Sequence, residues 1–148
     1  MGDYKLNNKW VLWFHSLNNP NWDNKSYIKV MEIKTLLDYK LLEDVLRINH
    51  LQNGMFFLMK NEIFPTWEDP KNRLGGCISF KYDNNILKEW LRTLLFCITN
   101  NLFKKNNIDE INGISIAPKK EFNIVKIWIR DDTKDHKKLV REYEPFIK

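Results

Sequence analysis

The alternation of apolar and polar residues along the chain predicts a protein built on β-strands. Strands are predicted over residues 9–15, 27–33, 55–59, 76–82, 113–117 and 123–130. In the first of them, Lys9–His15, both alternating faces are apolar. A strand with two apolar faces is covered on both sides, so we expect it inside the sheet.

Apolar residues at helical spacing predict three helices between and after these strands. The first begins at Thr35, with Asp38 three residues later as a variant of the capping box. The longest begins after Asn84 or Asn85, and a highly charged third helix is predicted over residues 133–143. Most neighbouring strands have hairpin-like connections. The pattern therefore predicts an α+β fold: a single curved, mainly antiparallel sheet with about three helices on its convex face and an open concave face.

The length and composition predict one folded domain over residues 1–148, with residues 1–8 as a flexible N-terminal segment. Of the 148 residues, 43% are hydrophobic and 29% charged, which is typical of a globular chain. No long apolar run predicts a membrane span, and the N-terminus lacks a signal-peptide pattern. Cys77 and Cys97 are too few for a zinc site. We therefore expect a cytoplasmic monomer without a metal or cofactor.

One loop and two further tryptophans stand out as candidate binding residues. The loop Phe64–Gly76 places Trp67 beside Glu68, with basic residues nearby. Trp22 lies alone in a polar loop, and Trp128 is predicted on the open face of the sheet. Two indoles can sandwich a flat ring, and stacking of a base on an aromatic ring contributes roughly 1–3 kcal/mol. A cationic ring adds about 2 kcal/mol in a desolvated site.

A carboxylate beside a stacking ring indicates which base would fit. Glu68 can accept hydrogen bonds from N1 and N2 of guanine, a pair of donors that adenine lacks. The net charge of +5 is compatible with an anionic partner. Candidate phosphate-binding side chains are Lys119, Lys120, Lys126 and Arg130. Together these residues predict a receptor for a positively charged guanine nucleotide with a phosphate chain.

The chain resembles the eukaryotic translation initiation factor 4E family, the mRNA 5′-cap-binding proteins. The matching segments are residues 9–14 (KWVLWF), the isolated Trp22, Thr35 with Asp38-Tyr39, residues 63–69 (IFPTWED) with Asn72 and Gly75-Gly76, Trp90-Leu91 with Thr93-Leu94-Leu95, and Ile127-Trp128. They occur in the order and near the spacing of the family.

The resemblance implies that the chain binds the 7-methylguanosine cap of mRNA in translation initiation. Trp22 and Trp67 would sandwich the methylated base, and the backbone N–H of Trp67 would reach its carbonyl. Glu68 would read the guanine edge, and Trp128 would lie against the methyl group. The remaining tryptophans are expected in the core: Trp10, Trp13 and Trp90.

The predicted phosphate end departs from the family pattern. Cys77 stands where the family usually has an arginine. Counting back from Trp128 puts Lys119 at the family's other arginine position, but Ile124 at its lysine position. Because strand side chains alternate, Lys126 shares the face of Trp128, and Lys81 shares the face of Cys77. We therefore expect phosphate contacts that are kept but rearranged.

The predicted partner surface on the convex face also departs from the pattern. The family's tryptophan that receives the Tyr-x-x-x-x-Leu helix of scaffold proteins is Lys40 here, and an acidic position is Arg92. The apolar positions Leu36, Leu91 and Leu95 remain. Loss of a tryptophan anchor and gain of two positive charges argue against binding of the usual basic motif.

Other functions are compatible with the same residues. A generic single-stranded RNA binder would use the same aromatics and charge without cap selectivity. A cap-sequestering regulator would hold caps without recruiting a scaffold. The many Asn, Lys and Ile residues fit an AT-rich genome, so a divergent parasitic or viral version is a further alternative. No catalytic constellation is evident, and we expect no enzyme activity.

Overall fold

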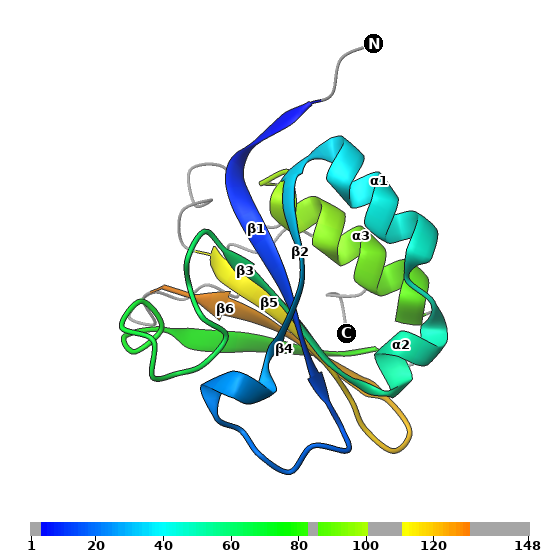
Figure 1. Cartoon of the computed structure of the whole chain (residues 1–148), viewed down its shortest axis with the longest axis vertical. Helices are drawn as coiled ribbons and strands as arrows, with labels where there is room; N and C mark the ends of the chain where they lie inside the picture. The colour runs from blue at the N-terminus through cyan, green and yellow to red at the C-terminus, as the bar shows by residue number, and fades with distance from the viewer. Residues whose placement is uncertain (1–3, 83–85, 101–110, 131–148) are drawn as a thin grey trace.

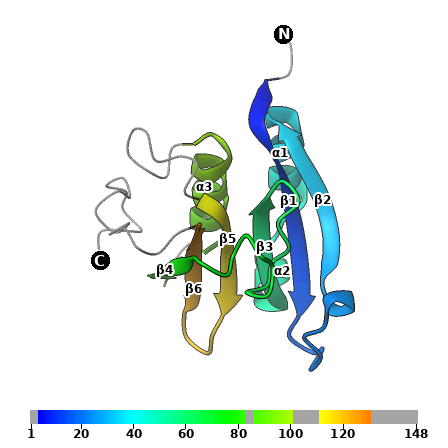
Figure 2. The same cartoon turned by 90° about the vertical axis from the view of Figure 1, so that its left-hand side faces the viewer.

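A computed structural model describes residues 4–82, 86–100 and 111–130, which form an open antiparallel sheet with helices on one side (Figure 1). The strands are β1 (Lys5–Ser16), β2 (Ile28–Thr35), β3 (Gly54–Lys60), β4 (Gly76–Tyr82), β5 (Ile111–Pro118) and β6 (Asn123–Ile129). Their order in the sheet is β2-β1-β3-β5-β6-β4, and each neighbouring pair is antiparallel. Figure 2 shows β2 near one edge of this sheet and β4 at the other.

Within the described residues, three α-helices cover the convex face: α1 (Leu36–Val45), α2 (Ile48–Gln52) and α3 (Ile86–Ile98). The predicted capping box starts α1. The Thr35 hydroxyl accepts a hydrogen bond from the Asp38 N–H at 3.2 Å, and the Asp38 carboxylate accepts one from the Thr35 N–H. A short 3-10 helix, η1 (Asn24–Ser26), lies in the loop between β1 and β2.

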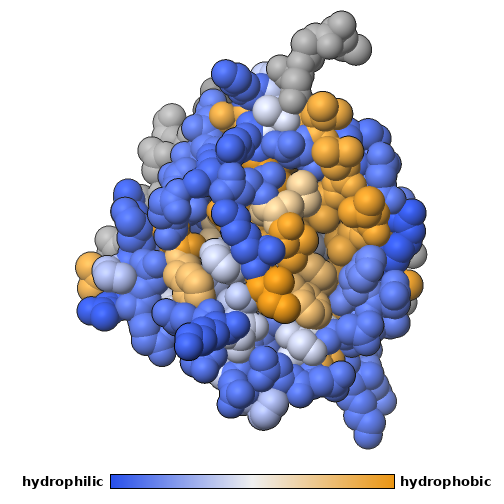
Figure 3. Space-filling view, in the orientation of Figure 1, coloured by the Kyte–Doolittle hydropathy of each residue, from blue (hydrophilic) through white to orange (hydrophobic). Residues whose placement is uncertain are grey.

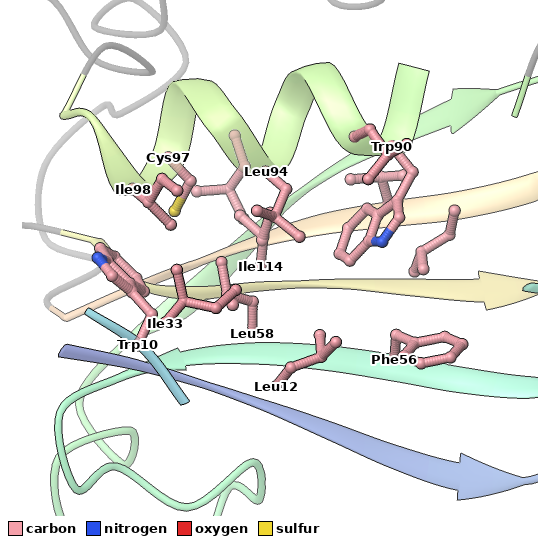
Figure 4. Packing of buried hydrophobic residues seen from close by; sticks show 14 of the residues in the cluster. Trp10, Leu12, Ile33, Phe56, Leu58, Trp90, Leu94, Cys97, Ile98 and Ile114 are labelled. Atoms are coloured by element: carbon pink, nitrogen blue, oxygen red, sulfur yellow. The ribbon is translucent and has the colours of Figure 1, made fainter. Parts of the chain in front are cut away.

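The core lies between α3 and the strands beneath it (Figure 4). Trp90 and Leu94 point from α3 toward the sheet, where they meet apolar side chains of the inner strands. Trp10 on β1 and Trp90 on α3 are buried in the core, as predicted. Trp13, also predicted in the core, is only partly buried. One face of each inner strand therefore forms the core, and the alternate residues face the open side of the sheet.

The predicted α+β class and single antiparallel sheet are confirmed, with differences in detail. Residues 5–8, predicted as part of a flexible N-terminal segment, belong to β1. The helix α2 was not predicted, because five residues are too few to show helical periodicity. The helix predicted over residues 133–143 lies outside the described residues.

Candidate functional site

The concave face of the sheet carries a second apolar cluster, separate from the main core. Its buried members are Phe57, Met59, Ile63 and Trp128. Trp13, Tyr27, Met55 and Cys77 pack against them and are partly buried. Among the described residues no helix covers this face of the sheet, and its aromatic rings form the surface on which the candidate binding residues are arranged.

The loop between β3 and β4 is held in shape by a buried asparagine. Asn72 is 1% exposed, and its Nδ2 donates hydrogen bonds to the carbonyl oxygens of Phe64 at 3.0 Å and Thr66 at 2.8 Å. The Nδ2 of Asn112, on β5, donates to the Oδ1 of Asn72 at 3.0 Å. The segment that carries Trp67 is thereby fixed to the sheet through side-chain amides.

The two neighbouring carboxylates of this loop have different roles. The Asp69 carboxylate accepts hydrogen bonds from the backbone N–H of Phe64 at 2.8 Å and of Lys71 at 2.9 Å, so it shapes the loop. The Glu68 side chain is exposed, and Arg73 donates to its backbone carbonyl rather than to its carboxylate. Of the two acids, Glu68 is the one whose carboxylate remains available to a ligand.

Trp67 stacks on Trp128. The two ring centroids are 4.8 Å apart and the planes are inclined by 12°. Trp128 is 5% exposed, and its Nε1 donates a hydrogen bond to the Oγ of Ser115 at 3.0 Å. Trp67 remains 45% exposed. One face of its indole is therefore covered by a fixed inner ring, and much of the rest faces solvent.

Trp22 shows the same arrangement on the other loop. Its ring lies 3.6 Å from that of His15, with the planes inclined by only 3°. His15 is 1% exposed, whereas Trp22 is 55% exposed. Both predicted stacking tryptophans thus have one face on a buried ring and present open indole surface.

Tyr27 connects the two loops. Its ring meets Trp22 edge-on at 6.1 Å and Phe64 edge-on at 5.3 Å, so it touches both ends of the site. Burial, and then the negative charge of Glu68, raise the pKa of the Tyr27 hydroxyl. Glu68 and Trp22 therefore flank the same tyrosine, although they are 46 residues apart in the sequence.

A row of polar residues lies next to the Trp128 row on the same sheet face. Lys126 of β6 pairs with Ser79 of β4 and with Ser115 of β5, one step along the strands from Trp128. Burial raises the pKa of the Cys77 thiol, and the positive charge of Lys126 opposes this shift. The charge of Lys126 is therefore felt at Cys77, the residue that pairs with Trp128 on the neighbouring strand.

The other predicted phosphate-binding residues lie farther away. Lys81 stacks its ammonium group over the Phe122 ring at 4.8 Å. Lys119 and Lys120 lie in the exposed turn after the last paired residue of β5. A strand rises about 3.3 Å per residue, which puts this turn roughly 17 Å from the Trp128 row. Arg130 lines a separate polar cavity of about 630 Å³ that also includes Lys60, Lys71 and Asn112.

The predicted partner surface lies on the convex side. Lys40 forms an ion pair with Glu43 at 2.9 Å, and Arg92 forms one with Glu89 at 3.8 Å. Leu91 is buried, and Leu36 and Leu95 are partly exposed. Figure 3 shows apolar side chains gathered over α1 and β2. The exposed apolar residues of these two elements are Ile28, Val30, Leu37, Leu41 and Val45.

Sequence reasoning missed three residues of the site: His15, Tyr27 and Ser115. Alternation along β1 placed His15 on the same face as Trp13, but gave no sign that it lies against Trp22. Tyr27 begins a predicted strand, and Ser115 lies in a predicted hairpin. Their contacts join segments far apart in the chain, so no local pattern could have identified them.

An antiparallel sheet with helices on one face and two backed, exposed indoles on the other defines an α+β protein with a ring-stacking surface. A sequence profile described as "Eukaryotic initiation factor 4E" matches residues 5–147. The chain belongs to the eukaryotic initiation factor 4E family.

Relatives support this assignment at moderate sequence identity. Eukaryotic translation initiation factor 4E of Candida albicans is 28% identical over 94% of this chain and 70% of its own length. The homolog from Acanthamoeba polyphaga mimivirus is 24% identical over 76% of this chain and 50% of its own length. A solved complex of C. elegans eIF4E-3 with the 4E-binding protein Mextli and cap analog has a TM-score of 0.81 at 25% identity. It covers 90% of this chain, which in turn covers 78% of that chain.

The described part of the chain shows no grouping of three His, Cys, Asp or Glu residues that could hold a metal ion. Within those same ranges, no helix is long and apolar enough to cross a membrane.

Proposed function

We propose that the protein binds the 7-methylguanosine 5′ cap of mRNA and acts in translation initiation. The observation that carries this proposal is the pairing of two exposed indoles, Trp22 and Trp67, each backed by a buried ring. Glu68 supplies a carboxylate beside one of them and near the tyrosine that contacts the other. These are the groups that a flat base with edge donors requires.

The chemistry of the base explains the choice of side chains. Methylation at N7 makes guanine cationic, so it is attracted to the electron-rich faces of Trp22 and Trp67 as well as stacking on them. The Glu68 carboxylate accepts hydrogen bonds from N1 and N2 of the base. Bonds to an ionised acceptor are roughly twice as strong as neutral ones. Unmethylated guanine keeps the edge contacts and loses the cationic term.

Trp128 would contribute mainly by supporting Trp67. It is 5% exposed and covered by the Trp67 ring, so a direct contact with the methyl group requires Trp67 to move away from it. The hydrogen bond from Trp128 to Ser115 fixes the supporting ring in one orientation.

Lys126 is the strongest candidate for the cap phosphates. It lies one row from Trp128 between the hydroxyls of Ser79 and Ser115, on the open face. The exposed Lys126 ammonium group and the exposed Ser79 hydroxyl beside it can both donate hydrogen bonds to phosphate oxygens, whereas the Ser115 hydroxyl is buried against Trp128. Lys81 follows one further row along β4 and would contact a later phosphate. The proposal assigns Lys119, Lys120 and Arg130 weaker, longer-range contributions.

Family membership supports this reading over a generic single-stranded RNA binder. The family is named for initiation of translation, and the C. elegans neighbour was solved with a cap analog. Binding and presentation of the cap need no bond-breaking step, so the proposed activity is not enzymatic.

Methyl selectivity is the direct test of the proposal. Adding 7-methyl-GTP should quench the tryptophan fluorescence of the protein at concentrations at least about tenfold lower than GTP, because only the methylated base is cationic. Equal responses to the two nucleotides, or none, would contradict the proposal. Binding of uncapped RNA as tight as that of capped RNA, with a steep salt dependence, would favour the generic RNA binder.

The proposed partner on the convex face is a translation-initiation scaffold protein, contacted through α1 and α3. Lys40 and Arg92 add positive charge to this surface, which disfavours a basic Tyr-x-x-x-x-Leu peptide. We expect such a peptide to bind the wild type weakly and the Lys40→Trp, Arg92→Glu double variant at least tenfold more tightly. Titration calorimetry with one peptide and both proteins measures this difference. Tight binding by the wild type would refute the charge argument.

A further inference from the structure

His15 lies directly beneath Trp22 at the end of β1. It is 1% exposed, and its ring is 3.6 Å from the Trp22 ring with nearly parallel planes. Its neighbours in the alternation of β1, Trp13 and Val11, lie on the same sheet face, where Val11 is buried and Trp13 partly buried. The imidazole is therefore a fixed inner surface, whereas the indole above it is more than half exposed.

The imidazole also holds the backbone next to Trp22. Its Nε2 lies 2.7 Å from the carbonyl oxygen of Asn21, the residue immediately before Trp22. Its Nδ1 lies 3.0 Å from the carbonyl oxygen of Ser16, where the loop begins. A neutral imidazole has one N–H and an imidazolium has two, so at least one of these contacts can be a donated hydrogen bond. The same side chain thus contacts the Trp22 ring, the start of its loop at Ser16 and the backbone of Asn21 beside it.

Hydrogen bonds order the backbone on both sides of Trp22, from Asn21 N–H to Asn19 and between Asp23 and Ser26, but in the described part of the chain few rings contact the indole itself. Residues 20–25, around Trp22, are exposed and belong to a polar loop. Among the described residues, the only other ring that meets Trp22 is Tyr27, which approaches edge-on at 6.1 Å. An exposed side chain without a backing surface samples several rotamers, and a ligand must restrict them on binding.

We infer that His15 is the positioning residue of the proposed base site, which holds Trp22 with one indole face open before a ligand arrives. The effect of His15 on ligand affinity rests on the proposed function, because the open face of Trp22 would stack on the base. His15 does not touch the ligand. It acts through Trp22, by stacking and by its contact with the carbonyl of Asn21.

A double-mutant cycle separates positioning from general damage. We expect His15→Leu to lower the affinity for 7-methyl-GTP roughly five- to tenfold, because the indole loses its backing ring and its loop loses a tether. In a Trp22→Ala background, the same substitution should change the affinity less than twofold. Equal losses in both backgrounds would show that His15 only supports the fold. Unchanged affinity in the wild-type background would also overturn the inference.

The variant His15→Phe serves as a conservative rescue. Phenylalanine retains a flat ring to stack under Trp22 but cannot donate a hydrogen bond to Asn21. We expect it to recover part of the affinity lost in His15→Leu. Recovery no better than with leucine would contradict a role for the ring stack.

A second measurement needs no ligand, so it keeps this inference separate from the cap-binding proposal. The acrylamide quenching attributable to Trp22 is the difference between a protein and its Trp22→Phe form. We expect this difference to increase at least twofold in His15→Leu, because the covered indole face becomes accessible. If 7-methyl-GTP fails to bind the wild type, the cap proposal fails, while the quenching still decides whether His15 holds Trp22. An unchanged quenching difference overturns the positioning role.

Discussion

Replacing Trp67 with alanine is expected to lower the affinity for 7-methyl-GTP by roughly 100-fold or more. The indole contributes stacking of about 1–3 kcal/mol and, toward a cationic base, about 2 kcal/mol in a desolvated site. Together these contributions amount to about 3–5 kcal/mol, and since 1.4 kcal/mol corresponds to a factor of ten, the loss is about two to three and a half orders of magnitude. The loss should be smaller for unmethylated GTP, because the cationic term is then absent.

Fluorescence titration of Trp67→Ala and of a control in the same loop measures this effect. Leu74→Ala is the matched control, because Leu74 is 78% exposed and lies on the cavity beyond the loop rather than beside Trp22. It should bind 7-methyl-GTP like the wild type. A Trp67→Ala variant that remains folded and binds within threefold of the wild type would remove this indole from the site.

The fold was largely predictable because its signals are local. Alternation, together with one short apolar run over residues 55–59, identified the six strands of the described chain, and the Thr35 capping box marked the start of α1 to within one residue. What alternation cannot supply is strand order, since β3 pairs with β5 rather than with β4. The pairing of β3 with β5 depends on how the strands pack together beneath α3, which involves residues far apart in the sequence.

The site was predictable only in part, for the same physical reason. The loop around Trp67 was recognisable because an exposed tryptophan beside an acid is unusual in a polar segment. The difference between Glu68 and Asp69 was not, because it depends on which backbone N–H groups Asp69 meets after folding. The role of His15 was not predicted, because its contact with Trp22 depends on how the loop after β1 folds back over the end of that strand.

Strand parity does not determine where a side chain lies beyond the end of a strand. Lys126 and Arg130 share parity in the predicted strand over residues 123–130, and both are predicted phosphate-binding residues. The strand ends at Ile129, where the backbone of Gly75 approaches so closely that a Cβ at Gly75 would collide with the Ile129 carbonyl. After this point Arg130 lines the cavity on the far side of the loop, while Lys126 remains on the face that carries Trp128.

Trp90→Ala is expected to have the largest effect on stability. Trp90 is fully buried between α3 and the sheet, and Trp-to-Ala changes in cores cost about 3–5 kcal/mol through lost burial and the cavity left behind. Since domains of this kind are stable by only about 5–15 kcal/mol, the variant should unfold at much lower urea concentration. Urea titration followed by far-UV circular dichroism measures the change in the free energy of unfolding.

Trp22→Ala provides the matched control, because it removes the same side chain from an exposed position. It loses the stack on His15 and the edge-on contact with Tyr27, each worth at most about 1.5 kcal/mol, so its unfolding midpoint should fall much less than that of Trp90→Ala. Trp90→Phe keeps a ring in the core and should fall between the two, which tests the argument even if Trp90→Ala does not fold. Comparable losses for Trp90→Phe and Trp22→Ala would contradict the division of the tryptophans into core and site. Confirmation would separate two groups of tryptophans: Trp10 and Trp90 stabilise the core between α3 and the sheet, whereas Trp22 and Trp67 remain exposed in the loops, where stacking on a ligand can offset the lost burial.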